Sequence, residues 1–399
     1  MKRARKAKPP GSDGPGKTNR IPLSRPSFGK EEESAVLECL RSGWVSAGPR
    51  VAEFEQAFAK LTGTDEAVAT SSGTAALHLA LWSLGLQPGD EVITPSFTWV
   101  SVPNLITLLG ARPVFCDVDP ETLCLDLQDA ATVVTSRTKA IVTVHFAGRA
   151  CDMDAIRSFA AAHRLVVIED AAHAVGGAFQ GRPIGSHSPL CAFSFHPNKN
   201  ITTCEGGMLT GLDHDRLAFA RRHRYHGVTR DTYKRMGGGQ LPYYDEAEPG
   251  LKYIMTDVMA AIGLRQLAKV ERFNATRARL AKRYREGLHA LAGRVWVPPE
   301  DIRKESRHVW HLFTIRVEDI PGYRDHVMTK LEERGIGVGW HYRPVHELEW
   351  VRARNWGRPL PHTETIGRTI LSLPLYPNMT NAQVDRVVAV LGDVLKHGA

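Results

Sequence analysis

The stretch that decides the fold lies at residues 192–200 and reads Ala-Phe-Ser-Phe-His-Pro-Asn-Lys-Asn. The apolar residues 191–195 predict a buried strand, and Lys199 follows it in a turn that leads to Gly206 and Gly207. Ligands bind at the C-terminal ends of strands in open α/β sheets, so a lysine here can form an imine with a carbonyl compound. The alternative is an ordinary solvated surface lysine.

A second predicted strand, residues 165–169, brings a carboxylate to the same kind of position. Residues 166–173 read Val-Val-Ile-Glu-Asp-Ala-Ala-His, and Asp170 stands at the end of the apolar run. Its carboxylate can serve as a metal ligand, as a base or as the partner of a cationic heterocycle. Equally, Asp170 can cap the helix that follows.

A third segment, residues 70–77, reads Thr-Ser-Ser-Gly-Thr-Ala-Ala-Leu and joins a strand to a helix. A helix N-terminus exposes unpaired N–H groups and a partial positive charge, so it can hold a phosphate. Gly73 allows an anion to approach the backbone closely. The alternative is that Ser72 only caps the helix.

The three segments, each at a strand end of one sheet, together match the needs of pyridoxal phosphate. The helix start binds the phosphate, and the carboxylate keeps the pyridine nitrogen protonated, which makes the ring an electron sink. The lysine carries the imine and afterwards moves a proton. Trp99 follows another predicted strand end and can stack on the ring, with core packing as its alternative.

These segments belong to a β/α alternation over residues 60–260. Apolar strands that alternate with helices predict an α/β sheet covered by helices on both faces. Helices are expected at 30–42, 49–62, 74–84, 100–109 and 153–163, and strands at 67–70, 91–94, 113–117, 140–145, 165–169, 191–195 and 207–210. Long helices follow at 256–290. A smaller α+β domain should contain strands at 309–317 and 337–342 and helices near 323–334 and 380–396.

Composition is that of an ordinary globular protein, with 43% hydrophobic residues in 399. No apolar run approaches the ~18 residues of a membrane span, and no signal-peptide core is visible, so we expect a cytoplasmic protein without a membrane partner.

The six cysteines form no CxxC pair, so reduced thiols are expected. Two HxxH spacings lack a matching carboxylate or cysteine set, so no metal site is assigned. A GxxxxGKT match at residues 11–18 has neither the strand nor the helix that a phosphate loop requires.

The positive charge is concentrated at the N-terminus. Residues 1–20 hold seven Lys or Arg side chains against one Asp, and so carry most of the formal net charge of +8. Such a segment is typical of a disordered basic tail rather than a folded nucleic-acid surface, so no specific nucleic acid is expected. We therefore predict a tail at 1–20, a large domain at 21–290 with the interdomain helices, and a small domain at 291–399.

The chain resembles the DegT/StrS-type nucleotide-sugar aminotransferases from residue 21 nearly to its C-terminus. The lysine segment and the Glu-Asp-Ala-Ala segment at 169–172 are the most specific carriers of this resemblance. The other carriers are residues 42–49 (Ser-Gly-Trp-Val-Ser-Ala-Gly-Pro), 72–78, 89–95 (Gly-Asp-Glu-Val-Ile-Thr-Pro), 341–344 (His-Tyr-Arg-Pro) and 372–377 (Ser-Leu-Pro-Leu-Tyr-Pro).

The resemblance implies a fold type I (aspartate aminotransferase-like) α/β architecture and a homodimer with shared active sites. It implies Lys199 as the imine lysine and Asp170 as the pyridinium partner. Gly73, Thr74 and Ser194 match phosphate positions, Trp99 matches the stacking ring, and His173 stands near the cofactor's hydroxyl where many members have glutamine. The expected cofactor site is Ser72, Gly73, Thr74, Trp99, Asp170, His173, Ser194, His196 and Lys199.

The substrates implied by the resemblance are glutamate and a nucleotide-linked keto sugar. His173, the Trp99 segment and residues 253–257 are most similar to the UDP-4-amino-4-deoxy-L-arabinose aminotransferases, which act in lipid A modification, so a UDP-4-keto pentose is expected. Another 4- or 3-keto sugar, for O-antigens or antibiotics, is the alternative. A catalytically silent regulatory or binding homologue is a second alternative, against which Lys199 and Asp170 speak.

Two residues depart from the family's pattern. Asn198 precedes the lysine where a small or branched apolar residue is expected. Ile254 stands where relatives have an asparagine that reaches the neighbouring subunit's cofactor phosphate, and an isoleucine side chain has no donor for that contact.

Deleting residues 1–20 is expected to leave activity unchanged and to lower the isoelectric point from about 9.2. The segment carries charge but no large apolar side chain beyond Met1 that could anchor it to the folded domain. KM values of the full-length and truncated proteins test this, and a large rise in KM on deletion would show that the tail contacts substrate.

Overall fold

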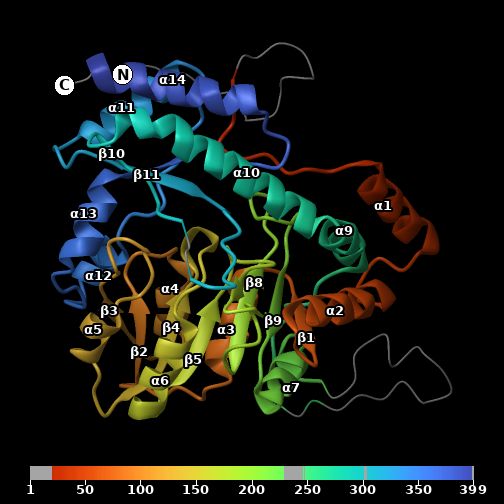
Figure 1. Cartoon of the computed structure of the whole chain (residues 1–399). Helices are drawn as coiled ribbons and strands as arrows, with labels where there is room; N and C mark the ends of the chain where they lie inside the picture. Colours follow the sequence, from red (N-terminus) through yellow and green to blue (C-terminus); the bar gives the residue numbers. More distant parts are fainter. Residues whose placement is uncertain (1–19, 229–245, 247, 301–302, 398–399) are drawn as a thin grey trace, which may run out of the picture.

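A seven-stranded sheet forms the centre of the molecule (Figure 1). The computed structural model describes residues 20–228, 246, 248–300 and 303–397. The strand order is β1-β9-β8-β5-β4-β2-β3, with β9 antiparallel to both neighbours and the other pairs parallel. The carboxyl ends of all strands but β9 therefore lie at one edge. The bounds are β1 (Ala67–Thr70), β2 (Glu91–Pro95), β3 (Arg112–Cys116), β4 (Thr138–Val144), β5 (Val166–Asp170), β8 (Leu190–Ser194) and β9 (Gly207–Thr210).

Helices cover both faces of this sheet because successive strand side chains belong to two different hydrophobic clusters. On β5, Val167 packs in one cluster and Ile168 in the other, and both side chains are buried. The first face is covered by α2 (Pro49–Thr62), α6 (Met153–His163) and α9 (Asp257–Leu267), and the second by α3 (Gly73–Trp82), α4 (Ser101–Leu108) and α7 (His214–His223). The predicted α/β architecture is confirmed.

A smaller antiparallel sheet forms a second core. Its strands are β10 (Val295–Trp296), β11 (Phe313–Val317) and β12 (Ile370–Leu373). They pack with α11 (Tyr323–Glu333), α14 (Asn381–His397) and the second half of α10 (Val270–Leu288), where Tyr284 stacks on Phe313 at 4.7 Å. The predicted domain boundary at residue 290 stays a prediction.

The remaining elements include α1 (Lys30–Ser42), α5 (Leu127–Ala131), α12 (Glu349–Arg352), α13 (Pro361–Thr369) and the hairpin β6 (Ala178–Phe179)–β7 (Arg182–Pro183).

The helix α10 links the two cores. Its first half contributes Val270 and Phe273 to the large core, and its second half contributes Leu280 and Tyr284 to the small one. Between them Arg277 is buried, and its Nη1 donates to the backbone oxygens of Trp310, His311 and Leu375. Figure 1 shows α10 crossing between the large sheet and α14.

One predicted strand is wrong. Residues 337–342 do not form a strand, because their backbone divides its hydrogen bonds between two neighbours. The Gly337 N–H donates to the Ile21 oxygen, while Gly339 exchanges two hydrogen bonds with Ser372 of β12. The strand predicted at 309–317 is shorter than expected and begins at Phe313.

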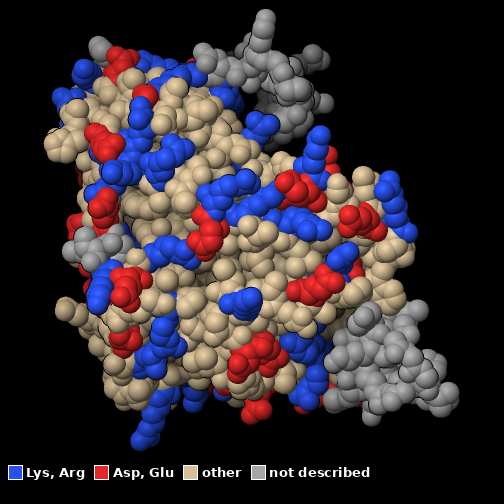
Figure 2. Space-filling view, turned by 45° about the vertical axis from the view of Figure 1, so that its right-hand side comes forward, with Lys and Arg blue, Asp and Glu red and all other residues tan. Residues whose placement is uncertain are grey.

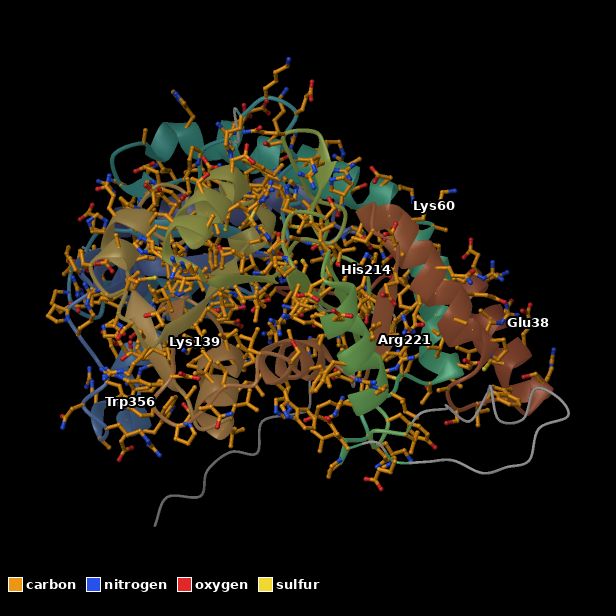
Figure 3. All side chains as sticks on the ribbon, turned by 90° about the horizontal axis from the view of Figure 1, so that it is seen from below. Glu38, Lys60, Lys139, His214, Arg221 and Trp356 are labelled. Atoms are coloured by element: carbon orange, nitrogen blue, oxygen red, sulfur yellow. The ribbon has the colours of Figure 1, made fainter. Side chains whose placement is uncertain are left out.

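A buried ion-pair network joins α7 to α2 and β1. Glu55 of α2 binds Arg221 at 2.9 Å and also pairs with Arg224, and its Oε1 accepts the Ala69 N–H of β1. Figure 3 shows Arg221 on α7 beside α2. This network therefore fixes α2 and α7 to the edge strand β1.

The surface in Figure 2 shows Lys and Arg side chains lying among Asp and Glu side chains. Of the predicted basic tail, residues 1–19 lie outside the described residues, and Arg20 pairs with Glu332 at 2.8 Å. Within the described part of the chain, no helix has the length and apolar character needed to cross a membrane.

Candidate active site

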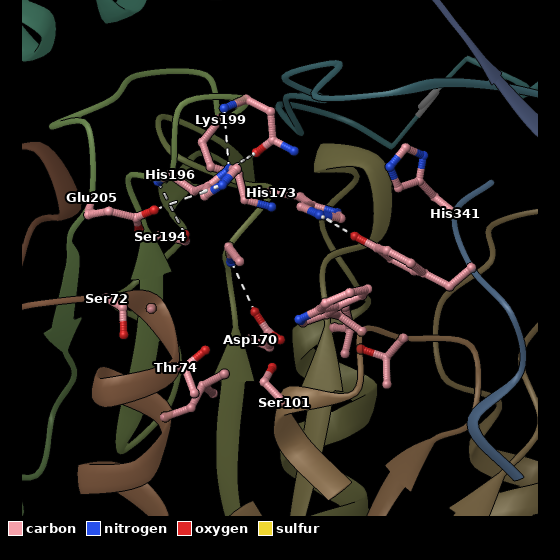
Figure 4. Close-up of a pocket in the computed structure, with 18 of the residues that line it drawn as sticks. Ser72, Thr74, Ser101, Asp170, His173, Ser194, His196, Lys199, Glu205 and His341 are labelled. Atoms are coloured by element: carbon pink, nitrogen blue, oxygen red, sulfur yellow. Dashed lines mark hydrogen bonds and ion pairs between the residues drawn. The ribbon is translucent and has the colours of Figure 1, made fainter. Parts of the chain in front are cut away.

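A pocket of about 500 Å³ opens at the C-terminal edge of the large sheet (Figure 4). All nine residues predicted for the cofactor site line it. Figure 4 shows Ser72 and Thr74 on one side and His341 on the other. The lining is Ser72, Gly73, Thr74, Leu77, Thr98, Trp99, Ser101, Val144, Asp170, Ala172, His173, Ser194, His196, Asn198, Lys199, Glu205, Trp340, His341 and Tyr342.

The start of α3 forms one wall. Ser72 is its N-cap, and the Ser72 side chain accepts a hydrogen bond from the Ala75 N–H, so the capping interpretation of Ser72 is correct. The N–H groups of Gly73 and Thr74 have no acceptor within the helix and face its open end. Thr74 is exposed toward the pocket. This end of α3 is therefore a suitable site for an anion.

Two glycines allow the start of α3 to approach the ends of β8 and β9 closely. A Cβ on Gly73 would lie 2.7 Å from the Ser194 Cβ of β8, and a Cβ on Gly207 of β9 would lie 2.4 Å from the Ser72 carbonyl carbon. Neither position has room for a side chain, so helix and strand ends can meet only with glycine there.

Asp170 lies at the end of β5 and is 6% exposed. Its Oδ1 accepts the Ala172 N–H at 3.0 Å, and no helix follows, so its role is not that of a helix cap. Burial raises the pKa of Asp170, while the Ala172 hydrogen bond and the charge on Lys199 oppose the shift. A cationic group beside this carboxylate would complete the compensation of its charge.

Lys199 lies in the turn after β8, where its N–H donates to the His196 oxygen at 2.9 Å. It is not a solvated surface lysine, since its side chain lines the pocket. Burial lowers the pKa of Lys199 to about 8, against the opposing attraction of Asp170. At pH 7 about a tenth of its amine is therefore neutral and nucleophilic, far more than in a lysine of ordinary pKa.

A cluster of histidines and a tyrosine lies next to Lys199. The Tyr342 hydroxyl is 3.1 Å from His173 Nε2, and His173 Nδ1 is buried without a hydrogen-bond partner in the described part of the chain. Burial, with Lys199 second, lowers the pKa of His173 well below its usual value and that of His341 to about 4. Both rings are neutral, and His173 Nδ1 is available to a bound group.

The wall formed by Trp340, His341 and Tyr342 was not included in the predicted site. The His-Tyr-Arg-Pro motif at 341–344 was a signal for it, but the segment was predicted as a strand of the small domain. Trp99 is 58% exposed in the pocket, which excludes core packing as its role.

Among the described residues, no group of His, Cys, Asp or Glu side chains is arranged to hold a metal ion.

The model of the DegT/DnrJ/EryC1/StrS aminotransferase family matches residues 26–392. The chain belongs to this family. Its members are aminotransferases by description, which agrees with a pocket built from a lysine of lowered pKa, a buried carboxylate and an open helix end.

Three solved structures illustrate the similarity. Spr1654 of Streptococcus pneumoniae in its PLP form is 30% identical, with a TM-score of 0.87 over 95% of this chain and 100% of that one. DesV of S. venezuelae, in complex with a ketimine intermediate, is 33% identical, with a TM-score of 0.84 over 95% and 100%. DesI, in the presence of its TDP-sugar product, is 33% identical, with a TM-score of 0.85 over 96% and 94%.

Borohydride reduction of the protein loaded with pyridoxal phosphate is expected to fix one cofactor mass on the peptide that contains Lys199. Because only the neutral amine reacts, the rate of capture by the cofactor-free protein should rise with pH, be half-maximal near pH 8 and level off at higher pH. Mass spectrometry of the digested protein measures both.

Lys199→Arg is the matched control and should abolish the label. Exposed lysines such as Lys60 and Lys139 (Figure 3) should stay unlabelled at equimolar cofactor. A label on any other lysine contradicts the assignment.

Proposed function

We propose that the chain transfers the amino group of glutamate to the keto carbon of a nucleotide-linked sugar, with pyridoxal phosphate held at Lys199. The observation that carries the proposal is the convergence of Lys199, Asp170 and the open start of α3 on one pocket. The family of aminotransferases to which the chain belongs, and the PLP and PMP forms of Spr1654, support the same cofactor here.

The residues of the pocket fit this cofactor. The unpartnered N–H groups of Gly73 and Thr74 suit a phosphate, and Ser194 lines the same pocket. The buried Asp170 carboxylate suits a protonated ring nitrogen, and the unpartnered His173 Nδ1 suits the ring hydroxyl. When bound, the cofactor supplies an electron sink.

The chain's own groups then have separate tasks. Asp170 keeps the ring nitrogen protonated, and Lys199 Nζ, once released, moves the proton at the carbon that gains or loses the amino group. His173 and His341 are neutral, so the lowered pKa of Lys199 comes from burial rather than from neighbouring positive charge.

For the sugar, we propose a UDP-linked 4-keto pentose, on the similarity around His173 and Lys199. A second candidate is a TDP-linked keto sugar, favoured by the 33% identity with DesI, whose structure contains a TDP-sugar product. A homodimer with composite sites, expected from the family resemblance, is part of the proposal.

Replacing Asp170 with asparagine is expected to slow the half-reaction with glutamate on the order of a hundredfold, or about 2.7 kcal/mol. An amide is uncharged and cannot hold the ring nitrogen in its protonated form. Single-turnover absorbance of the bound cofactor measures the rate.

Asp213→Asn is the matched control, because Asp213 caps α7 and is not part of the pocket lining. It should react at the native rate. Near-normal rates in Asp170→Asn would contradict the role of this carboxylate.

Turnover with UDP-4-keto-L-arabinose is expected to exceed turnover with dTDP-linked 4-keto-6-deoxyhexoses. The comparison of kcat/KM with glutamate as donor decides between the two substrate classes. The reverse order would assign the protein to the O-antigen or antibiotic branch, and an absence of turnover with any keto sugar would leave the silent homologue.

A further inference from the structure

Trp99 lies in the pocket with little to hold its ring. Its side chain is 58% exposed, and its ring contact is with Tyr342, at a centroid distance of 5.9 Å and an interplanar angle of 50°. An exposed ring that bounds a pocket keeps its place only if its backbone is held. The segment 96–99 that carries it must therefore be anchored elsewhere.

Ser96 provides this anchor, because it is fully buried and bonded to a segment 250 residues away. Its backbone oxygen accepts the Val345 N–H at 2.9 Å. Its Oγ accepts the His346 N–H at 3.1 Å and lies 2.6 Å from His346 Nδ1. Between Ser96 and Trp99, Phe97 is 1% exposed and packs on Phe146 at 5.0 Å.

The hydrogen-bond network determines which atom donates. Because Ser96 Oγ already accepts the His346 N–H, its own proton is satisfied only if it donates to Nδ1. His346 then carries its proton on Nε2, which lies 3.5 Å from Glu364 Oε1 of α13. In the other tautomer the Ser96 hydroxyl proton would be buried without an acceptor, which is costly.

The same contact also holds the opposite wall. His346 belongs to the 3₁₀ helix Val345–Glu347, which directly follows the segment with His341 and Tyr342. Both segments line the pocket, one with Thr98 and Trp99 and the other with His341 and Tyr342. One buried contact thus joins the chain segments of the two walls.

We propose that His346 is a positioning residue that acts through Ser96 to set the separation between Trp99 and Tyr342. Neither residue of this Ser96–His346 latch is part of the pocket lining. It rests on the proposed function only in that the pocket is the active site. Its consequence is that the packing of the Trp99 ring against the Tyr342 ring, in the wall of the pocket, depends on the buried hydrogen bonds between Ser96 and His346.

Hydrogen exchange of the cofactor-free protein tests the latch directly. Ser96→Ala and His346→Gln should each raise exchange at the amides of residues 345–346 and 97–101 about tenfold or more. His346→Gln loses the bond between Ser96 Oγ and His346 Nδ1, and Ser96→Ala loses in addition the acceptor of the His346 N–H. His346→Asn should restore most of the protection, because its Oδ1 is bonded to Cγ, as Nδ1 is, and can accept the Ser96 proton. Glutamine reaches the Nε2 position instead and cannot.

The loaded enzyme gives the second measurement. Ser96→Ala and His346→Gln should lower kcat/KM for the keto sugar about tenfold and alter the visible circular dichroism of the cofactor, with His346→Asn near native. Tyr284→Phe is the control for general loss of stability, since the Tyr284 hydroxyl donates to the Pro374 oxygen in the other core. It should lower Tm without changing exchange at 97–101.

Equal effects of His346→Asn and His346→Gln, or unchanged exchange at 97–101 in both latch variants, would overturn the proposal. If one variant fails to fold, the other still decides. A native protein that binds no pyridoxal phosphate would refute the proposed function, whereas the exchange experiment on the cofactor-free protein would still test the latch.

Discussion

The close contact between the start of α3 and the ends of β8 and β9 is the constraint on which the pocket depends. Without side chains at Gly73 and Gly207, the first turn of the helix reaches the edge of the sheet. Its free N–H groups thereby lie in the same pocket as Asp170 at the end of β5 and Lys199 after β8. Any side chain at either glycine would separate the anion site from the two groups of the proposed chemistry.

Burial acts on Asp170 and Lys199 in the same sense, since it moves both toward their neutral forms. For the lysine this is useful, because a neutral amine is the nucleophile. For the aspartate it is a cost that a cationic ring nitrogen can offset. A cofactor bound as proposed would therefore complete the electrostatics of the pocket, because the charge of the Asp170 carboxylate is only partly compensated by the protein's own groups.

Much of the fold could be predicted from the sequence because its strands are apolar, short and bounded by clear turn residues. The bounds of β1, β9, α1, α2 and α6 agree with the prediction to the residue. The cofactor side of the pocket could also be predicted from the sequence, because its residues lie at or just after the ends of predicted strands. The opposite wall could not be predicted in this way, because residues 340–342 are placed by tertiary contacts with His173, Ser372 and Gly367. No local periodicity records such contacts, and the same segment has the apolar and aromatic composition of a strand.

The position of α10 in both cores has a mechanical consequence. A rigid rotation of the small sheet against the large one would bend this helix or pull Arg277 away from its three backbone oxygens. Close-packed protein interiors do not deform smoothly, so α10 opposes such a rotation of one unit against the other. A bulky substrate would then enter through movements of side chains and short loops at the pocket mouth, rather than through hinge bending of whole domains.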